Sequence, residues 1–112
     1  MDKETYDCGI IGAGLAGLST AILLSRLGYK VLVLEQKKFP MHKVCGEYVS
    51  MESYDFLENL GLPLSKMNLP MIRKVNISAP NGSMLSEELY LGGFGISRYW
   101  MDDLLAKKSV EF

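Results

Sequence analysis

Two short apolar runs flank a segment with helical spacing near the start of the chain. Residues 6–11 and 30–34 are almost continuously apolar, as is typical of buried parallel strands. Between them, from Gly14 to Leu27, apolar residues recur every three or four positions, and Gly28 follows where a left-handed helix cap would lie. A strand, a helix and a strand within about 30 residues predict a right-handed βαβ unit.

Beyond the second run the pattern becomes irregular and then helical. Residues 36–49 are polar and contain a proline and a glycine, so we expect a loop. Residues 51–60 carry apolar side chains on one helical face and end at Gly61, which predicts a second helix. Residues 62–70 contain two prolines and predict another loop.

A hairpin and a final helix are predicted for the last third of the chain. Residues 75–79 alternate between apolar and polar side chains, so one face of this strand should be wet. The Pro-Asn-Gly sequence at 80–82 is a turn signal, and residues 83–90 return as the partner strand. After the glycine-rich stretch 91–96, the side chain of Ser97 can cap a helix whose acidic residues precede its lysines, the order that the helix dipole favours.

Length and composition indicate one small globular core and argue against nucleic acid and a membrane span. The chain has 112 residues, of which 48% are hydrophobic and 22% charged, so we expect a single core. Twelve basic and thirteen acidic residues give a net charge of −1, which offers no basic excess to attract nucleic acid. No apolar run reaches the ~20 residues of a membrane span, and no signal peptide is visible, which favours a cytoplasmic setting.

Cysteine and histidine are too few and too scattered to predict a metal site. Cys8 and Cys45 have neither zinc nor disulfide-framework spacing, and His42 is the only histidine. We expect Cys8 in the core, because it lies inside the first apolar run, and His42 at the surface of a polar loop.

Residues 12–17 read Gly-Ala-Gly-Leu-Ala-Gly, a G-x-G-x-x-G pattern between the first predicted strand and the first predicted helix. In this context Gly12 allows a tight turn, Gly14 lets the backbone approach a pyrophosphate, and Gly17 lets the helix and strand pack closely. A glycine turn that binds nothing is the plain alternative.

The helix N-terminus and an acidic residue strengthen the prediction of a nucleotide site. The amides of the new helix, those of Leu15 and Ala16 among them, would face the phosphates at the positive end of the dipole. Glu35 ends the second strand, 18 residues beyond Gly17, where a carboxylate accepts hydrogen bonds from ribose hydroxyls. A 2′-phosphate would be repelled there, which argues against NADP.

The spacing continues beyond the third glycine as three residues, Ala21, six residues and Gly28. This extended arrangement resembles the N-terminal dinucleotide-binding segment of FAD-dependent oxidoreductases. The resemblance implies FAD as the cofactor, with residues 12–17 at its pyrophosphate and Glu35 at its adenosine ribose.

Residues 39–47 read Phe-Pro-Met-His-Lys-Val-Cys-Gly-Glu. They resemble the Phe-Pro-Arg-x-Lys-x-Cys-Gly-Glu stretch of geranylgeranyl reductases, which belong to the flavoprotein group similar to para-hydroxybenzoate hydroxylase. The resemblance implies that Cys45 and Gly46 contact FAD; a small apolar filler without a redox role is the alternative for Cys45. Met41 stands where the relatives carry Arg, and Lys43 could partly replace that charge.

Residues 92–105 contain an Arg-x-x-x-Asp-x-x-Leu core formed by Arg98, Asp102 and Leu105. It is similar to the helix that follows the first substrate-domain strands in the same flavoprotein group. The resemblance implies that Arg98 reaches back to FAD and that Asp102 supports the helix start. The alternative is a solvated Arg98, although a basic charge at a helix N-terminus opposes the dipole and suggests another partner.

Together these patterns predict an α/β fold: a Rossmann-like βαβ FAD-binding unit, a helix, a β-hairpin from the start of a substrate domain, and a final helix. The predicted divisions are 1–70 for the N-terminal part of the FAD-binding domain, 71–96 for the hairpin, and 97–112 for the helix returning to the FAD domain. The resemblance implies the FAD-binding portion of a reductase or monooxygenase that acts on an apolar or aromatic substrate, with NAD(P)H as a candidate reductant.

Two other functions remain open from the sequence. The chain matches only the N-terminal third of a family member and lacks the later Gly-Asp segment, so it could be a truncated, non-catalytic nucleotide-binding fragment that is inactive alone. The exposed edges of a two-stranded sheet would then invite self-association. An NAD-dependent dehydrogenase domain would explain the glycines and Glu35, but neither the Cys45 loop nor the Arg98 helix. No residue stands out as a general acid or base, so the catalytic residues are unassigned.

Overall fold

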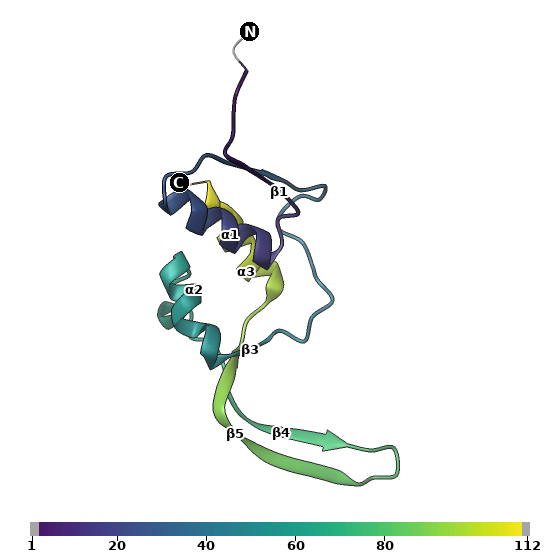
Figure 1. Cartoon of the computed structure of the whole chain (residues 1–112). Coiled ribbons are helices and arrows are strands. Elements are labelled where there is room, and N and C mark those ends of the chain that lie inside the picture. The colour runs from purple at the N-terminus through teal and green to yellow at the C-terminus, as the bar shows by residue number, and fades with distance from the viewer. Residues whose placement is uncertain (1–2, 111–112) are drawn as a thin grey trace.

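The computed structural model describes residues 3–110 and contains two small sheets connected by helices (Figure 1). β1 (Cys8–Ile11), α1 (Leu15–Arg26) and β2 (Val31–Leu34) form the predicted βαβ unit. β1 and β2 pair in parallel over their whole length. At the end of α1, Gly28 has φ +91° and its N–H donates to the carbonyl of Ser25 at 3.0 Å, which confirms the predicted left-handed cap.

The two parallel strands are covered on one face only. Ile10 faces α1, whereas the side chain of Ile11 is 91% exposed and that of Leu34 is 54% exposed. The prediction of buried strands was therefore wrong for the face opposite α1, because no element among residues 3–110 packs over it. Cys8 is on the same face as Ile10, at the start of β1, and is only half-buried, so its expected place in the core was wrong.

The second half of the chain forms a small antiparallel sheet, short helical segments and a final helix. The elements, in order, are β3 (Tyr48–Ser50), the 3₁₀ helix η1 (Met51–Ser53), α2 (Tyr54–Leu60), the 3₁₀ helix η2 (Leu64–Lys66), β4 (Met71–Ser78), β5 (Met84–Gly95) and α3 (Arg98–Ser109). The strand order is β3-β5-β4, with both pairs antiparallel. The predicted helix, hairpin and final helix are thus confirmed, and the fold is α/β.

Two strand segments differ from the sequence-based expectation. β3 lies at the end of the predicted loop 36–49, because three residues are too few to produce a periodic pattern. The glycine-rich stretch 91–96 largely belongs to β5, where Gly93 pairs with Ser50 and lies against the ring of Tyr48. A Cβ at Gly93 would overlap that ring, so the glycine makes room for an aromatic side chain from β3.

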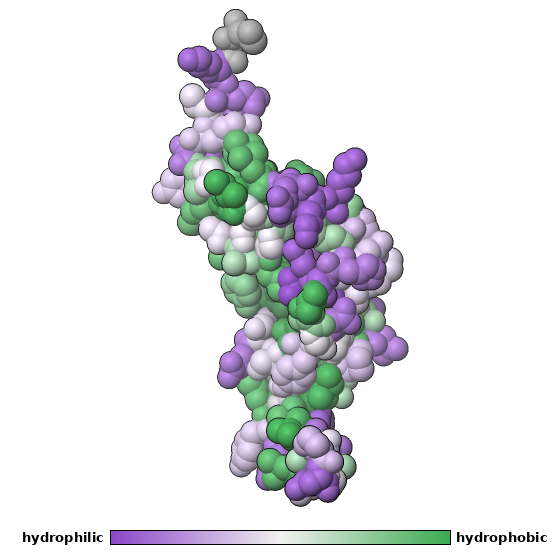
Figure 2. All heavy atoms as spheres, turned by 90° about the vertical axis from the view of Figure 1, so that its right-hand side faces the viewer, coloured by the Kyte–Doolittle hydropathy of each residue, from purple (hydrophilic) through white to green (hydrophobic). Residues whose placement is uncertain are grey.

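The β4–β5 hairpin projects from the body of the molecule (Figure 1). Its turn forms as predicted, with the Gly82 N–H donating to Ala79 O at 3.0 Å and the Ala79 N–H donating to Ser83 O at 2.8 Å. Both faces of its outer half are exposed, rather than one, and apolar residues lie open at its end (Figure 2). The overall extents of 67 × 28 × 20 Å reflect this projection.

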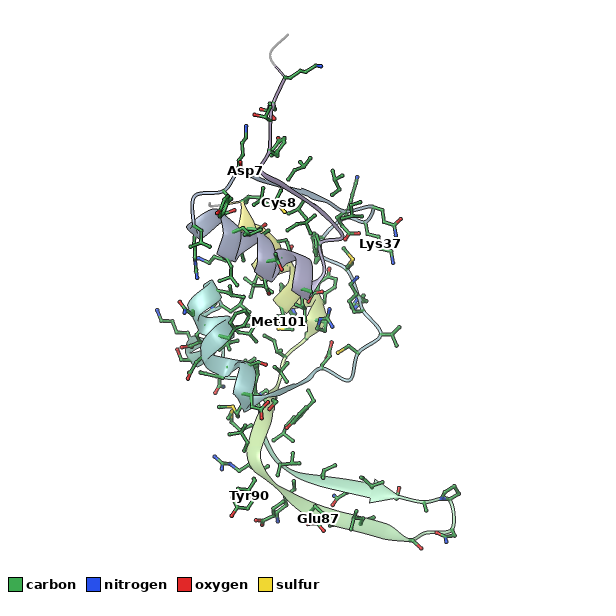
Figure 3. The ribbon with its side chains drawn as sticks, viewed as in Figure 1. Asp7, Cys8, Lys37, Glu87, Tyr90 and Met101 are labelled. Atoms are coloured by element: carbon green, nitrogen blue, oxygen red, sulfur yellow. The ribbon has the colours of Figure 1, made fainter. Side chains whose placement is uncertain are left out.

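The core lies where the three helices meet the base of β5. Ile22 of α1, Phe94 of β5 and Leu105 of α3 are fully buried. Met101 of α3 also lies in this core (Figure 3), and the ring of Tyr54 packs edge-on against Phe94 with centroids 5.5 Å apart. The predicted apolar face of residues 51–60 therefore faces the core.

The predicted domain divisions at 70/71 and 96/97 remain predictions. Residues 1–2 of the first predicted segment and 111–112 of the third lie outside the described residues. None of the helices within residues 3–110 combines the length and apolar character needed to cross a membrane.

The close approach of α1 to β1 gives a first testable prediction. A Cβ on Gly17 would overlap the carbonyl oxygen of Gly12, which is backbone and cannot turn aside. We expect Gly17→Ala to lower the free energy of unfolding by roughly 1–3 kcal/mol in urea titrations, through overpacking. The control is Gly9→Ala, where the new Cβ meets nothing within 4 Å, and it should remain within about 0.5 kcal/mol of wild type. Equal free energies of unfolding for Gly17→Ala and Gly9→Ala would contradict the close contact between Gly17 and the Gly12 carbonyl.

Candidate functional site

A cleft of about 680 Å³ opens where β1 and β2 end, and its volume is within the range of small-molecule sites. Ligands in open parallel sheets bind at the carboxyl ends of the strands. Four of the ten predicted site residues line the cleft: Gly12, Gly14, Glu35 and Lys43. The other lining residues are Ile11, Leu34, Gln36 and Lys37.

The glycine turn leaves the N-terminus of α1 open to an anion. Gly12 has φ +99°, and its N–H donates to Leu34 O at 2.7 Å, which ties the turn to the end of β2. Gly14 is the residue before the first helical turn; within the described chain no side chain caps this end, and its first turn holds no acidic residue. A Cβ on Gly14 would meet nothing within 4 Å, so there is space for a ligand against the backbone. Unpaired amides at the positive end of a helix favour a phosphate in that space.

Glu35 is held by the backbone on two sides. Its Oε2 accepts a hydrogen bond from the Ala13 N–H at 2.8 Å, and its Oε1 accepts one from the Lys37 N–H at 3.1 Å. These two amides, Ala13 first, lower the pKa of the Glu35 carboxyl below its ordinary value of 4.5, and the charge of Lys43 lowers it further. Each carboxylate oxygen retains further acceptor capacity, which ribose hydroxyls could use.

Two lysines give the cleft a positive side. Lys43 was predicted from the sequence, whereas Lys37 was not. Lys37 follows the end of β2 by three residues and lies beside the cleft (Figure 3). A lysine in a loop produces no periodic or spacing signal, so only the structure brings it to the site.

Three predicted residues take positions on α1 away from the lining of the cleft. The side chains of Leu15 and Ala16 line an apolar groove of about 420 Å³ against α2 and α3. Gly17 faces Gly12 and Ile10, where it permits the close helix–strand contact. Only the backbone amides of Leu15 and Ala16 could therefore serve the cleft.

Cys45, Gly46 and Arg98 are also outside the lining of the cleft. The Arg98 guanidinium binds Asp102 with two hydrogen bonds, Nε to Oδ1 at 2.8 Å and Nη2 to Oδ2 at 3.0 Å. Asp102 is completely buried and the Arg98 side chain is 18% exposed. The Asp102 carboxylate, and after it the Cys45 thiol, raise the pKa of Arg98. Arg98 is therefore not a solvated charge. Asp102 is the partner that offsets its unfavourable position, as a basic residue, at the N-terminus of a helix.

The cap of α3 differs from the prediction. Ser97 is the N-cap residue, but its hydroxyl makes no capping hydrogen bond. The carboxylate of Glu47 accepts the Arg98 N–H instead, at 3.2 Å, and places a negative charge at the positive end of the helix. The predicted capping by the Ser97 hydroxyl was wrong because Glu47, which lies 51 positions before Arg98, accepts the Arg98 N–H instead.

Cys45 does not lie in the core in this structure, and both interpretations of its role remain predictions. Cys45 is exposed, and its Sγ accepts a hydrogen bond from the Glu47 N–H at 3.3 Å. His42 is exposed as predicted, but it also stacks on Tyr99 of α3 with ring centroids 4.6 Å apart. Within residues 3–110, no three His, Cys, Asp or Glu side chains are grouped as metal ligands.

Comparison with known proteins gives one family and several partial relatives. The family model described as "FAD binding domain" matches residues 5–89. Over 61 residues the chain is 41% identical to conditioned medium factor receptor 1 of Dictyostelium discoideum, which covers 54% of this chain and 12% of that protein. Over 68 residues it is 41% identical to digeranylgeranylglycerophospholipid reductase of Sulfolobus acidocaldarius, covering 59% of this chain and 14% of that protein.

Among solved structures, the flavin-dependent brominase Bmp2 superposes with a TM-score of 0.77 at 28% identity. The match covers 95% of this chain and 27% of the brominase. The aligned part thus spans between 12% and 27% of the length of these three proteins.

The hydrogen bonds of Glu35 predict a dependence of stability on pH. Because the folded pKa lies below the ordinary value of 4.5, this group stabilises the fold fully above about pH 4.5. That contribution is lost as the pH falls through the folded pKa, where the carboxylate takes up its proton. Between pH 5 and about pH 3, urea midpoints should therefore fall more steeply for wild type than for Glu35→Gln. Parallel pH curves for the two proteins would refute this.

The buried Asp102 predicts a large effect of removing Arg98. Arg98→Ala leaves a buried carboxylate without its partner, which should cost about 3–5 kcal/mol in urea unfolding followed by circular dichroism. The double variant Arg98→Leu/Asp102→Leu removes both charges and should recover much of that loss. The matched control is Lys107→Ala, which removes an ion pair of the same spacing in which the lysine side chain is 71% exposed and that of Asp103 is 9% exposed; because Asp103 is not completely enclosed as Asp102 is, this variant should cost less than Arg98→Ala. A loss for Arg98→Ala no larger than for Lys107→Ala would disprove the role of the buried pair.

Proposed function

The chain belongs to the FAD binding domain family, and from this membership we propose that its residues bind FAD for a flavin-dependent oxidoreductase acting on an apolar or aromatic substrate. One observation carries the proposal: a single cleft contains both the uncapped N-terminus of α1 and a carboxylate fixed at the end of β2. The first suits a pyrophosphate and the second suits a ribose, the two polar parts of a dinucleotide.

The residues of the cleft fit the polar half of FAD in charge as well as in shape. The open space at Gly14 lets a phosphate meet the amides of α1. Glu35 would accept hydrogen bonds from the adenosine ribose, and the charges of Lys37 and Lys43 would offset those of the phosphates. Bound FAD would supply hydride and electron transfer, while these residues bind and orient it.

The proposed substrate class rests on the relatives. The Sulfolobus protein is named as a reductase of a digeranylgeranyl phospholipid, which supports an apolar substrate. The brominase is named for flavin-dependent halogenation, so the fold alone does not choose the reaction. NAD(P)H as the reductant of the flavin and a cytoplasmic setting remain predictions from the sequence. Self-association through the edges of the two-stranded β1–β2 sheet remains a prediction as well.

The cofactor can be tested by titration of the purified 112-residue chain with FAD and, separately, with NADH. Trp100 is the only tryptophan, so quenching of its emission by the flavin reports binding. We expect a saturable complex with FAD, retained on a desalting column together with the visible flavin band. A chain that stays colourless, or that binds NADH in preference to FAD, would contradict the proposal.

Two variants locate the binding within the cleft. Glu35→Ala should weaken FAD binding by about tenfold or more, since hydrogen bonds to a charged group are lost. Gly14→Val should abolish binding while the chain remains folded, because its side chain enters open space. The control is Glu87→Ala on the projecting hairpin (Figure 3), which should bind FAD as wild type does. Unchanged affinity in both cleft variants would place FAD elsewhere.

A further inference from the structure

We infer that Glu47 is a positioning residue of the flavin site: it joins the Cys45–Gly46 turn to the first turn of α3. This inference rests on the proposed function, because Cys45, Gly46 and Arg98 are the residues that the family resemblance assigns to FAD. The resemblance assigns no role to Glu47 itself.

The first observation is that Glu47 uses three of its polar groups, one within its own turn and two toward a segment far away in the sequence. Its N–H donates to Cys45 Sγ at 3.3 Å, and its carbonyl accepts the Ile96 N–H at 3.0 Å. Its Oε1 accepts the Arg98 N–H at 3.2 Å. Glu47 thereby links the turn before β3 directly to the junction of β5 and α3.

The second observation is the backbone conformation of Glu47. Its φ is +59°, in the left-handed region that few residues other than glycine adopt. Glycine would adopt this conformation at lower cost, but it has no carboxylate. A glycine here would thus lose the carboxylate, which is the group that caps α3.

The third observation is how Arg98 is held. Glu47 binds its backbone N–H, and Asp102 binds its guanidinium from one turn later in the helix. The guanidinium is also close enough to the Cys45 thiol for that thiol to raise its pKa, after Asp102. The stacking of His42 on Tyr99 adds a second contact between the loop and the helix. Cys45 and Arg98 are therefore neighbours because the Glu47 connection keeps the loop against α3.

The experiment measures how well FAD protects Cys45 from alkylation. Wild type and variants are treated with iodoacetamide with and without FAD, and the Cys45 and Cys8 peptides are quantified by mass spectrometry, with Cys8 as the internal reference. In wild type, bound FAD should slow the alkylation of Cys45. Glu47→Gly accommodates φ +59° but removes the carboxylate, so we expect FAD to bind within about threefold of wild type while its protection of Cys45 falls by roughly tenfold. Glu47→Gln retains an acceptor oxygen for the Arg98 N–H and should restore most of the protection.

The matched control is Asn68→Gly, which relieves a similar backbone conformation, φ +52°, in a loop remote from Glu47 in the sequence. In this variant, FAD should protect Cys45 from alkylation as it does in wild type. In the absence of FAD, hydrogen exchange at the Arg98 amide should be faster in Glu47→Gly than in Asn68→Gly, because the amide has lost its acceptor.

Each outcome decides between the two proposals. If wild type binds no FAD, the proposed function fails and this inference fails with it. If wild type is protected and Glu47→Gly is protected equally, the inference is overturned and the proposed function stands. If wild type binds FAD but Glu47→Gly and Glu47→Gln both lose that binding, Glu47 is a direct ligand of the cofactor, which also overturns the positioning role.

Discussion

The backbone contact between Gly17 of α1 and Gly12 at the end of β1 is the constraint on which the rest of the structure depends. With no Cβ at Gly17, the helix lies directly against the turn that precedes it. This close contact fixes the direction in which the first amides of α1 point. It also brings the Ala13 nitrogen to 2.8 Å from Glu35 Oε2. The uncapped N-terminus of α1 and the Glu35 carboxylate, which directly follows β2, therefore border one cleft. A larger residue at this contact would separate the two halves of the site.

A second connection, built from charge, joins the later part of the chain to the first. Asp102 is buried in α3 and is stable there because Arg98 binds both of its carboxylate oxygens. Glu47 occupies the positive end of the same helix. Since α3 also packs beside α1 in the core (Figure 1), the loop that carries Cys45 is connected to the helix whose N-terminus borders the cleft. The predicted residues at the cleft and the Cys45–Arg98 group are therefore held by helices that pack together, although only the first group lines the cleft.

Two parts of the structure are exposed on faces that sheets usually bury. The face of β1 and β2 opposite α1 leaves Ile11 and Leu34 open, and the outer half of the β4–β5 hairpin is exposed on both faces. A two-stranded sheet and an isolated hairpin are both marginal structures in water. The chain aligns with between 12% and 27% of the three relatives compared, so in those proteins most of the polypeptide lies beyond the matched part.

The sequence by itself determined most of the elements and the glycine-rich turn before α1, because these depend on neighbours within a few positions. Glycine spacing, the apolar run of each strand and the helical period are local signals, and they located the βαβ unit, Glu35 and the hairpin turn correctly. Only the tertiary structure decided which distant groups meet. The capping of α3 by Glu47 rather than Ser97, the place of Lys37 beside the cleft and the open face of the parallel strands all depend on packing across tens of residues. Such contacts leave no periodic pattern in the chain, since their geometry exists only after the helices have packed around the core.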